Sequence, residues 1–176
     1  MPTAGLVEHA PGIVCARTRA SGAAGVPDIT SASLDSIGVH LDPSDDGVRQ
    51  LLGRSIQGRL VMLNLLRFRA WADYSAFPDL APPAPISGSA AYDRYVRHTR
   101  PILEATGGSI EFFGTGGHYF VGPADERWDL VMLIRQTSVR DFFAFASHES
   151  YLAGIGHRTA GLEDSRLLPL VDRAVP

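Results

Sequence analysis

The chain has 176 residues, of which 45% are hydrophobic and 20% are charged, and this suits one globular domain with or without a tail. A formal net charge of -3 provides no basic field for nucleic acid or an anionic membrane, so we expect neither partner. All 16 basic residues are arginine, which excludes a lysine Schiff base and a P-loop lysine.

Cysteine content and hydropathy bear on the compartment. The single cysteine, Cys15, cannot form an internal disulfide or a thiolate metal cage, and it fits a reducing cytoplasm. No apolar run approaches the ~18 residues that a membrane span needs, and the charged N-terminus lacks the core of a signal peptide. We therefore expect a cytoplasmic protein without a membrane span.

The first 56 residues differ in character from the rest. Residues 1–36 are rich in small, turn-forming types, so we interpret them as a largely irregular arm with one short strand, Gly12 to Arg17. The arm is either a lid or partner clasp, or a loosely packed terminus. Residues 42–46 supply an N-cap, a proline and acidic first-turn residues, which predict a helix ending near Gly53. We expect a domain boundary between residues 1–56 and 57–176.

The first half of the second part contains a strand, a loop and a helix. Residues 59–68 carry apolar side chains on both faces of the expected strand, which is typical of a central strand covered on both sides. Residues 69–88 are rich in proline and aromatic residues, so we expect a loop. Its aromatic side chains either pack against the domain or cover another part of the molecule. A helix is expected from Gly88 or Ser89 through Thr106, kinked at Pro101.

The second half adds three or four strands and two helical stretches. Residues 109–113 alternate as a strand, and we expect 118–121 to return as its hairpin partner across a glycine-rich turn. Residues 128–135 form another apolar strand. Ser138 caps a helix, and a second helical stretch is expected over 150–164. Residues 166–171 close the domain, with Pro169 indicating an edge strand or a bulge.

This order of elements predicts an α+β fold of ferredoxin-like, split βαβ type, with one antiparallel sheet and two helices on one face. Both faces of the central strands are apolar, and exposing the uncovered one costs about 25 cal/mol per Å². A second subunit is the simplest cover, so we predict a homodimer, in the manner of a dimeric α/β barrel.

A run of motifs between about residues 60 and 170 resembles the domain-of-unknown-function family 1330, DUF1330. The motifs are Asn64 to Phe68, Ala91 to Tyr95, Pro101 with Gly107 and Gly108, Arg127 to Asp129, Phe142, Tyr151, and Gly156 to Arg158 continuing into Leu162 to Arg166. The resemblance implies a ferredoxin-like fold that pairs into a dimeric α+β barrel, and it implies no common activity. Barrels of this architecture also resemble cofactor-free monooxygenases, muconolactone-type isomerases and heme-degrading enzymes.

Two polar residues interrupt the apolar pattern where burial is expected. Asn64 shares a strand face with apolar residues, where it orients a substrate carbonyl or bonds to neighbouring backbone. Arg158 follows the helical spacing of an inward face and therefore needs an anion. That anion is either a carboxylate of this chain or of a bound ligand; the chain's candidates are Asp129, Glu163 and Glu111.

Histidines supply the candidate proton-transfer groups, because an ordinary imidazole titrates near pH 6.5. His157 has small neighbours on a helix, and His98 lies one turn from Tyr95 beside the expected kink. Each is a candidate general acid or base, or else a structural or exposed histidine. His118 is a weaker candidate, and His148 is expected to begin a helix.

The histidines lack metal-binding spacing, so we expect no metal site and no cofactor. We expect each subunit to bind a small anionic or aromatic molecule between sheet and helices, and to perform proton transfer as an isomerase, a lyase or a cofactor-independent oxygenase. The alternatives are a non-catalytic binding or accessory protein and a heme-binding protein. The candidate catalytic residues are His157 and His98, and the candidate substrate-binding residues are Arg158, Asn64, Arg67, Tyr92, Phe113, Trp128, Asp129 and Tyr151.

Overall fold

The computed structural model describes residues 40–176, which lie in one compact unit. The predicted strand at Gly12 to Arg17 and the role of the arm lie outside the described residues. The elements are α1 (Asp45–Gly53), β1 (Leu60–Phe68), the 3-10 helix η2 (Pro78–Leu80), α2 (Gly88–Ala105), β2 (Ser109–Thr115), β3 (Leu130–Gln136), α3 (Val139–Ala146), α4 (Glu149–Gly161) and β4 (Leu162–Leu170).

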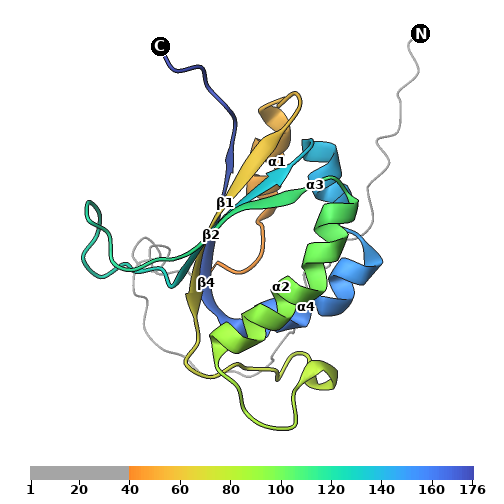
Figure 1. Cartoon of the computed structure of the whole chain (residues 1–176), viewed down its shortest axis with the longest axis vertical. Helices are drawn as coiled ribbons and strands as arrows, with labels where there is room; N and C mark the ends of the chain where they lie inside the picture. The colour runs from red at the N-terminus through yellow and green to blue at the C-terminus, as the bar shows by residue number, and fades with distance from the viewer. Residues whose placement is uncertain (1–39) are drawn as a thin grey trace, which may run out of the picture. The chain divides into compact units, whose positions relative to one another are not determined.

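The four strands form one antiparallel sheet in the order β2-β3-β1-β4, and α2 and α4 lie together on one face of it (Figure 1). This is the split βαβ arrangement of a ferredoxin-like α+β domain, which confirms the predicted fold class. Strand β4 is an edge strand, and its Pro169 is tolerated there because an edge strand leaves one side unpaired.

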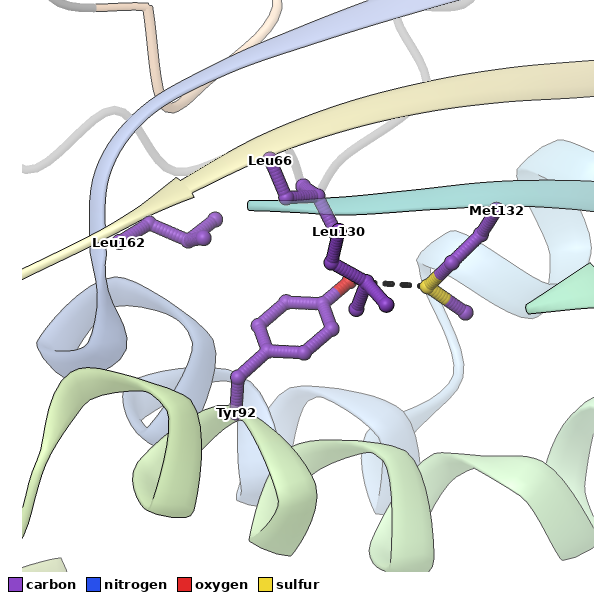
Figure 2. Close-up of a cluster of buried hydrophobic side chains, with 5 residues drawn as sticks. All are labelled: Leu66, Tyr92, Leu130, Met132 and Leu162. Atoms are coloured by element: carbon purple, nitrogen blue, oxygen red, sulfur yellow. Dashed lines mark hydrogen bonds between the residues drawn. The ribbon is translucent and has the colours of Figure 1, made fainter. Parts of the chain in front are cut away.

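The core lies between the sheet and the helices. Leu60, Met62 and Leu66 are almost completely buried on one face of β1, and Leu130 and Met132 lie on the same face of β3. Figure 2 shows that Tyr92 of α2 reaches into this cluster, where its hydroxyl donates to the Met132 sulfur at 3.6 Å. Aliphatic side chains from both strands therefore hold α2 against the sheet.

The opposite face of the sheet is apolar, and it is not the face that α2 and α4 cover. One cross-strand row runs over all four strands as Phe112, Leu133, Leu63 and Leu168, in the register of the ladder. Phe112 is 49% exposed and Leu168 is 52% exposed. We call this face the open face.

Helix starts follow the sequence signals closely. Ser44, Ser87 and Ser138 cap α1, α2 and α3, each accepting a hydrogen bond from a backbone N–H of the first turn. His148 caps α4 in the same way, so it begins a helix as predicted. Pro101 lies inside α2, which continues through it to Ala105.

The predicted hairpin partner of β2 was wrong. Strand β2 pairs with β3, whereas residues 118–121 lie in the connection and His118 makes only an isolated bridge with Arg127. The apolar run of β3 buries more side-chain surface beside β2 than residues 118–121 could, because Phe120 and Val121 lie in solvent. Alternation over four residues was too short a signal to identify a strand.

The end of α4 was also predicted too late. The helix ends at Gly161, and Leu162 to Asp164 begin β4. Leu162 is fully buried in the core cluster, and Gly161 comes so close to Gly88 that a Cβ there would lie 2.5 Å from the Gly88 oxygen. The contact between the two helices fixes the end of α4, and periodicity does not reveal it. No helix within residues 40–176 is long and apolar enough to cross a membrane.

Candidate functional site

The residues predicted as one site fall into three groups, and the most promising chemistry lies where α4 meets the loop of residues 69–87. His157 of α4 contacts Tyr74 of that loop, with the tyrosine oxygen 2.8 Å from the imidazole Nδ1. The two rings meet edge to face, and Tyr74 is buried. We call these two residues the Tyr74–His157 pair.

The loop is fixed to α4 by backbone bonds and by glycine contacts. Asp73 donates its N–H to the Ala160 oxygen at 2.9 Å, and Ala72 donates to the Ile86 oxygen at 2.9 Å. Phe77 and Leu80 pack on Gly156, where any Cβ would lie within 2.8 Å of both side chains. The pair is therefore positioned by the fold and does not depend on a free loop.

Burial and nearby cations set the protonation of the pair. Burial lowers the pKa of His157 from its ordinary 6.5, and the charges of Arg94 and His98 lower it further. Burial raises the pKa of the Tyr74 hydroxyl, and the Arg94 cation opposes that rise. At neutral pH the pair therefore consists of a neutral imidazole and a protonated phenol.

A cavity of about 240 Å³ lies beside Tyr74. Tyr74 is its main polar side chain, and the other lining residues are Ala72, Ala81, Pro82, Pro83, Ala84, Pro85 and Ile86. A mostly apolar wall of this size, with Tyr74 in it, suits a small organic molecule. Within the described residues no group of three or more acidic, histidine or cysteine side chains could hold a metal ion.

His98 lies at the same seam between α2 and α4 but has a different environment. It is exposed, its Nε2 lies 2.6 Å from the Ser150 carbonyl oxygen, and its ring packs on Gly154. The charge of His98 affects His157, so the two predicted catalytic histidines are neighbours. His98 bridges the helices, whereas His157 faces the loop.

Arg158 and the tyrosines form the second group. The Arg158 guanidinium donates to the Leu41 carbonyl at 2.6 Å and to the Ser165 hydroxyl at 3.2 Å. Its three candidate carboxylates have other partners: Glu111 pairs with Arg135, Glu163 with Arg67, and Asp129 with Arg127. Arg158 therefore pairs with none of the three carboxylates considered from the sequence, and its hydrogen-bond partners lie in the segment preceding α1 and at the start of β4.

The tyrosines beside Arg158 belong to the core. Tyr95 donates to the Tyr151 oxygen at 3.2 Å, and Tyr92 is buried among aliphatic side chains. Burial raises the pKa of Tyr92 and Tyr95 far above the ordinary value, so both remain protonated. Asn64 donates to the Met62 carbonyl at 3.0 Å, which is the structural role weighed from the sequence.

The third group lies at strand ends and on the open face. Arg67 pairs with Glu163 and Asp164, and Asp129 accepts a hydrogen bond from the Phe68 N–H at 2.8 Å. Trp128 is buried, and the guanidinium carbon of Arg166 lies 5.1 Å from its ring centroid. The structure does not bring this group to the pair.

Phe113 lines a separate cavity of about 330 Å³ with Val96, Arg100 and Ile110. Sequence reasoning did not select two residues of the site, Tyr74 and Arg94. The sequence feature that could have identified Tyr74 is its place in a proline-rich loop, where an aromatic side chain is expected to pack against the domain. Arg94 carried no signal, because an arginine on a helix is usually exposed to solvent.

Comparisons with known proteins show the family. No protein-family model matches the chain, and no curated protein matches it. The crystal structure of methylated RPA0582 protein is 33% identical over 77% of this chain and 96% of that chain, with a TM-score of 0.68. A second structure of RPA0582, a protein of unknown function from Rhodopseudomonas palustris, is 32% identical over 78% of this chain and 100% of that chain, with a TM-score of 0.67. The chain therefore belongs to the family of RPA0582.

Proposed function

We propose that the protein binds a small organic anion in the cavity beside Tyr74 and that the Tyr74–His157 pair moves a proton on it. The observations that carry this proposal are the 2.8 Å contact between the Tyr74 hydroxyl and His157 Nδ1 and the 240 Å³ cavity that Tyr74 lines. The positive charge of Arg94 near both rings favours a negative ligand.

The proton transfer is balanced within the pair and the ligand. Tyr74 takes a proton from the ligand while its own proton passes to Nδ1 of the neutral His157. The ligand is left as an enolate or alkoxide, and the imidazole becomes an imidazolium. Returning the proton to another ligand atom completes an isomerisation, and expelling a leaving group completes an elimination. His98 acts on this pair only through its position and charge.

Three probes of similar size test this proposal: benzoate, benzyl alcohol and benzylamine, titrated separately while the His157 imidazole nitrogens are followed by NMR. We expect benzoate to shift them most and benzylamine least, since Arg94 attracts an anion and repels a cation. Tyr74→Phe should weaken the benzoate effect at least about fivefold, whereas Tyr119→Phe, far along the chain, should leave it unchanged. If none of the probes shifts His157, or if benzoate acts as strongly in Tyr74→Phe as in the wild type, the proposal fails.

A second candidate is binding without catalysis. Leu66, Tyr92 and Met132 pack together between the centre of the sheet and α2, and Arg158 donates two hydrogen bonds to other residues of the chain. Both observations favour a scaffold role for the interior. This candidate predicts that benzoate binds beside Tyr74 while deuterium exchange at acidic C–H groups of bound small carboxylates stays at the solvent rate.

We further propose that the protein is a homodimer paired through the open face, and that its family is DUF1330. The open face supports the dimer, because its row of Phe112, Leu133, Leu63 and Leu168 leaves apolar area in water. A cytoplasmic location is also proposed, resting on the single Cys15.

A further inference from the structure

The connection between β2 and β3 is an ordered arm. Residues 116–127, which we call the hairpin arm, leave the sheet as a narrow loop. At its base Gly116 donates its N–H to the Asp129 oxygen at 3.1 Å, and Trp128 donates to the Gly117 oxygen at 3.1 Å. The bridge between His118 and Arg127 continues this pairing outward. Backbone bonds therefore pair the two sides of the arm at its base.

The tip of the arm presents apolar side chains to solvent. Phe120 is fully exposed and Val121 is 85% exposed. Tyr119 supports the turn at the tip through two contacts. Its hydroxyl accepts a hydrogen bond from Trp128 Nε1 at 2.9 Å, and its ring packs on Gly122. An ordered turn that holds a phenylalanine away from its own fold is typical of a contact residue.

The arm starts at the open face. Trp128 at its base stacks with Arg166, which pairs with Leu65 in the open-face register. Figure 1 shows the arm extending away from α2 and α4. The arm therefore projects on the side of the sheet away from α2 and α4, which is the side of the cross-strand row.

The charges of the arm decide between two partners for an exposed phenylalanine. Asp125 and Glu126 lie on the returning side of the arm, and the arm's one arginine, Arg127, pairs with Asp129. An anionic lipid surface repels these two acidic residues, although Glu126 accepts a hydrogen bond from Trp128 Nε1, and it finds no free arginine in residues 116–127. A second copy of this chain fits better, since a twofold dimer places each open face and its arm against the same surfaces of the other copy.

We propose that the hairpin arm clasps a second copy of the chain, with Phe120 as its anchor. This inference rests on the homodimer of the proposed function and names the segment that extends its interface beyond the sheet. A clasp of this kind explains together why Phe120 is exposed, why Tyr119 supports the turn and why acidic residues lie beside it.

Sedimentation velocity of the full chain over a concentration series tests the clasp. Phe120→Ser should raise the dimer dissociation constant at least about tenfold, because a buried aromatic anchor is lost. Trp71→Ser removes another exposed aromatic residue, 68% exposed, from the loop of residues 69–87 and should leave the constant unchanged. Equal dissociation constants for Phe120→Ser and the wild type would overturn the clasp while leaving the dimer intact. A wild-type protein that stays monomeric would overturn both.

A photo-cross-linking residue identifies what Phe120 touches. With benzoylphenylalanine in place of Phe120, light should yield a covalent dimer whose cross-linked peptide comes from the other copy. A product joined only within one chain, for example to residues 1–39, would overturn the clasp. Mixing isotopically labelled and unlabelled chains before irradiation separates the two results.

Discussion

Single side chains show how far local chemistry can be inferred. Arg158 was expected to hold an anion, and its observed partners are the Leu41 carbonyl and the Ser165 hydroxyl. The same segment is fixed twice more: the His40 N–H donates to Asp164 at 2.8 Å and the Ser165 hydroxyl donates to the His40 oxygen. Arg158 thus fastens the chain ahead of α1 to the start of β4.

Replacing Arg158 by Met should therefore cost stability. We expect the free energy of unfolding to fall by about 1.5–3 kcal/mol, since hydrogen bonds from a charged group to the segment are lost. Arg54→Met is the matched control, because Arg54 donates to the Pro169 oxygen from an exposed position and should cost less than about 0.5 kcal/mol. Urea unfolding of the three proteins measures both changes. Equal stability of Arg158→Met and the wild type would leave Arg158 free for a ligand.

The lowered pKa of His157 predicts how stability depends on pH. Between the folded pKa and 6.5 the unfolded chain binds more protons at this site than the folded chain, so stability falls as the pH is lowered through that window. Above pH 6.5 the contribution is complete. His157→Gln should lose less stability than the wild type between pH 7.5 and 5.5, as measured by urea unfolding. The other histidines are present in both proteins, so their contributions cancel in the difference between the two stability losses. An identical loss of stability in both proteins would contradict the lowered pKa of His157.

At the scale of elements, helix packing depends on one close approach of backbones. A Cβ at Gly88 would lie 2.4 Å from the carbonyl oxygens of Arg69 and Gly161, and neither backbone can yield easily. Gly53 at the end of α1 has no atom within 4 Å of such a Cβ. These two glycines, both in helices, therefore make a matched pair.

Gly88→Ala should lower the free energy of unfolding by about 1–3 kcal/mol, because α2 must move from α4 and the loop before it. Gly53→Ala should be neutral or stabilising by up to about 1 kcal/mol, because alanine favours the helix. Thermal and urea unfolding report both. A neutral Gly88→Ala would show that the helices are not in close contact there.

Elements with a strong local signal were predictable. The apolar runs of β1 and β3, the serine caps and the length of α2 follow from periodicity and capping, and their order gave the fold class. The failures share a tertiary cause. Residues 118–121 alternate without pairing with β2, and α4 ends at a glycine contact with α2. The grouping of the site was likewise not predictable, because His157 and Arg158 are adjacent in sequence but contact the loop and the His40–Leu41 segment on different sides of α4.

For the whole molecule, the open face should control association. Leu133→Asp places a carboxylate in the centre of the cross-strand row, and burying it against a second copy would cost far more than leaving it in water. We expect this variant to be monomeric while staying folded. Leu152→Asp on the exposed side of α4, 44% exposed in the wild type, is the control and should remain dimeric. Light scattering after size exclusion gives the masses; a dimeric Leu133→Asp would place the interface elsewhere.

The most direct measurement is an NMR titration of the His157 imidazole nitrogens in the wild type and in Tyr74→Phe. A pair in which Tyr74 is buried and His157 half-buried predicts a His157 pKa below 6.5 and an Nδ1 signal that is hydrogen-bonded at neutral pH. In Tyr74→Phe the Nδ1 signal should change and the pKa should rise, because the phenol no longer stabilises the neutral ring. A pKa at or above 6.5 that is the same in both proteins would show that the two side chains do not act together.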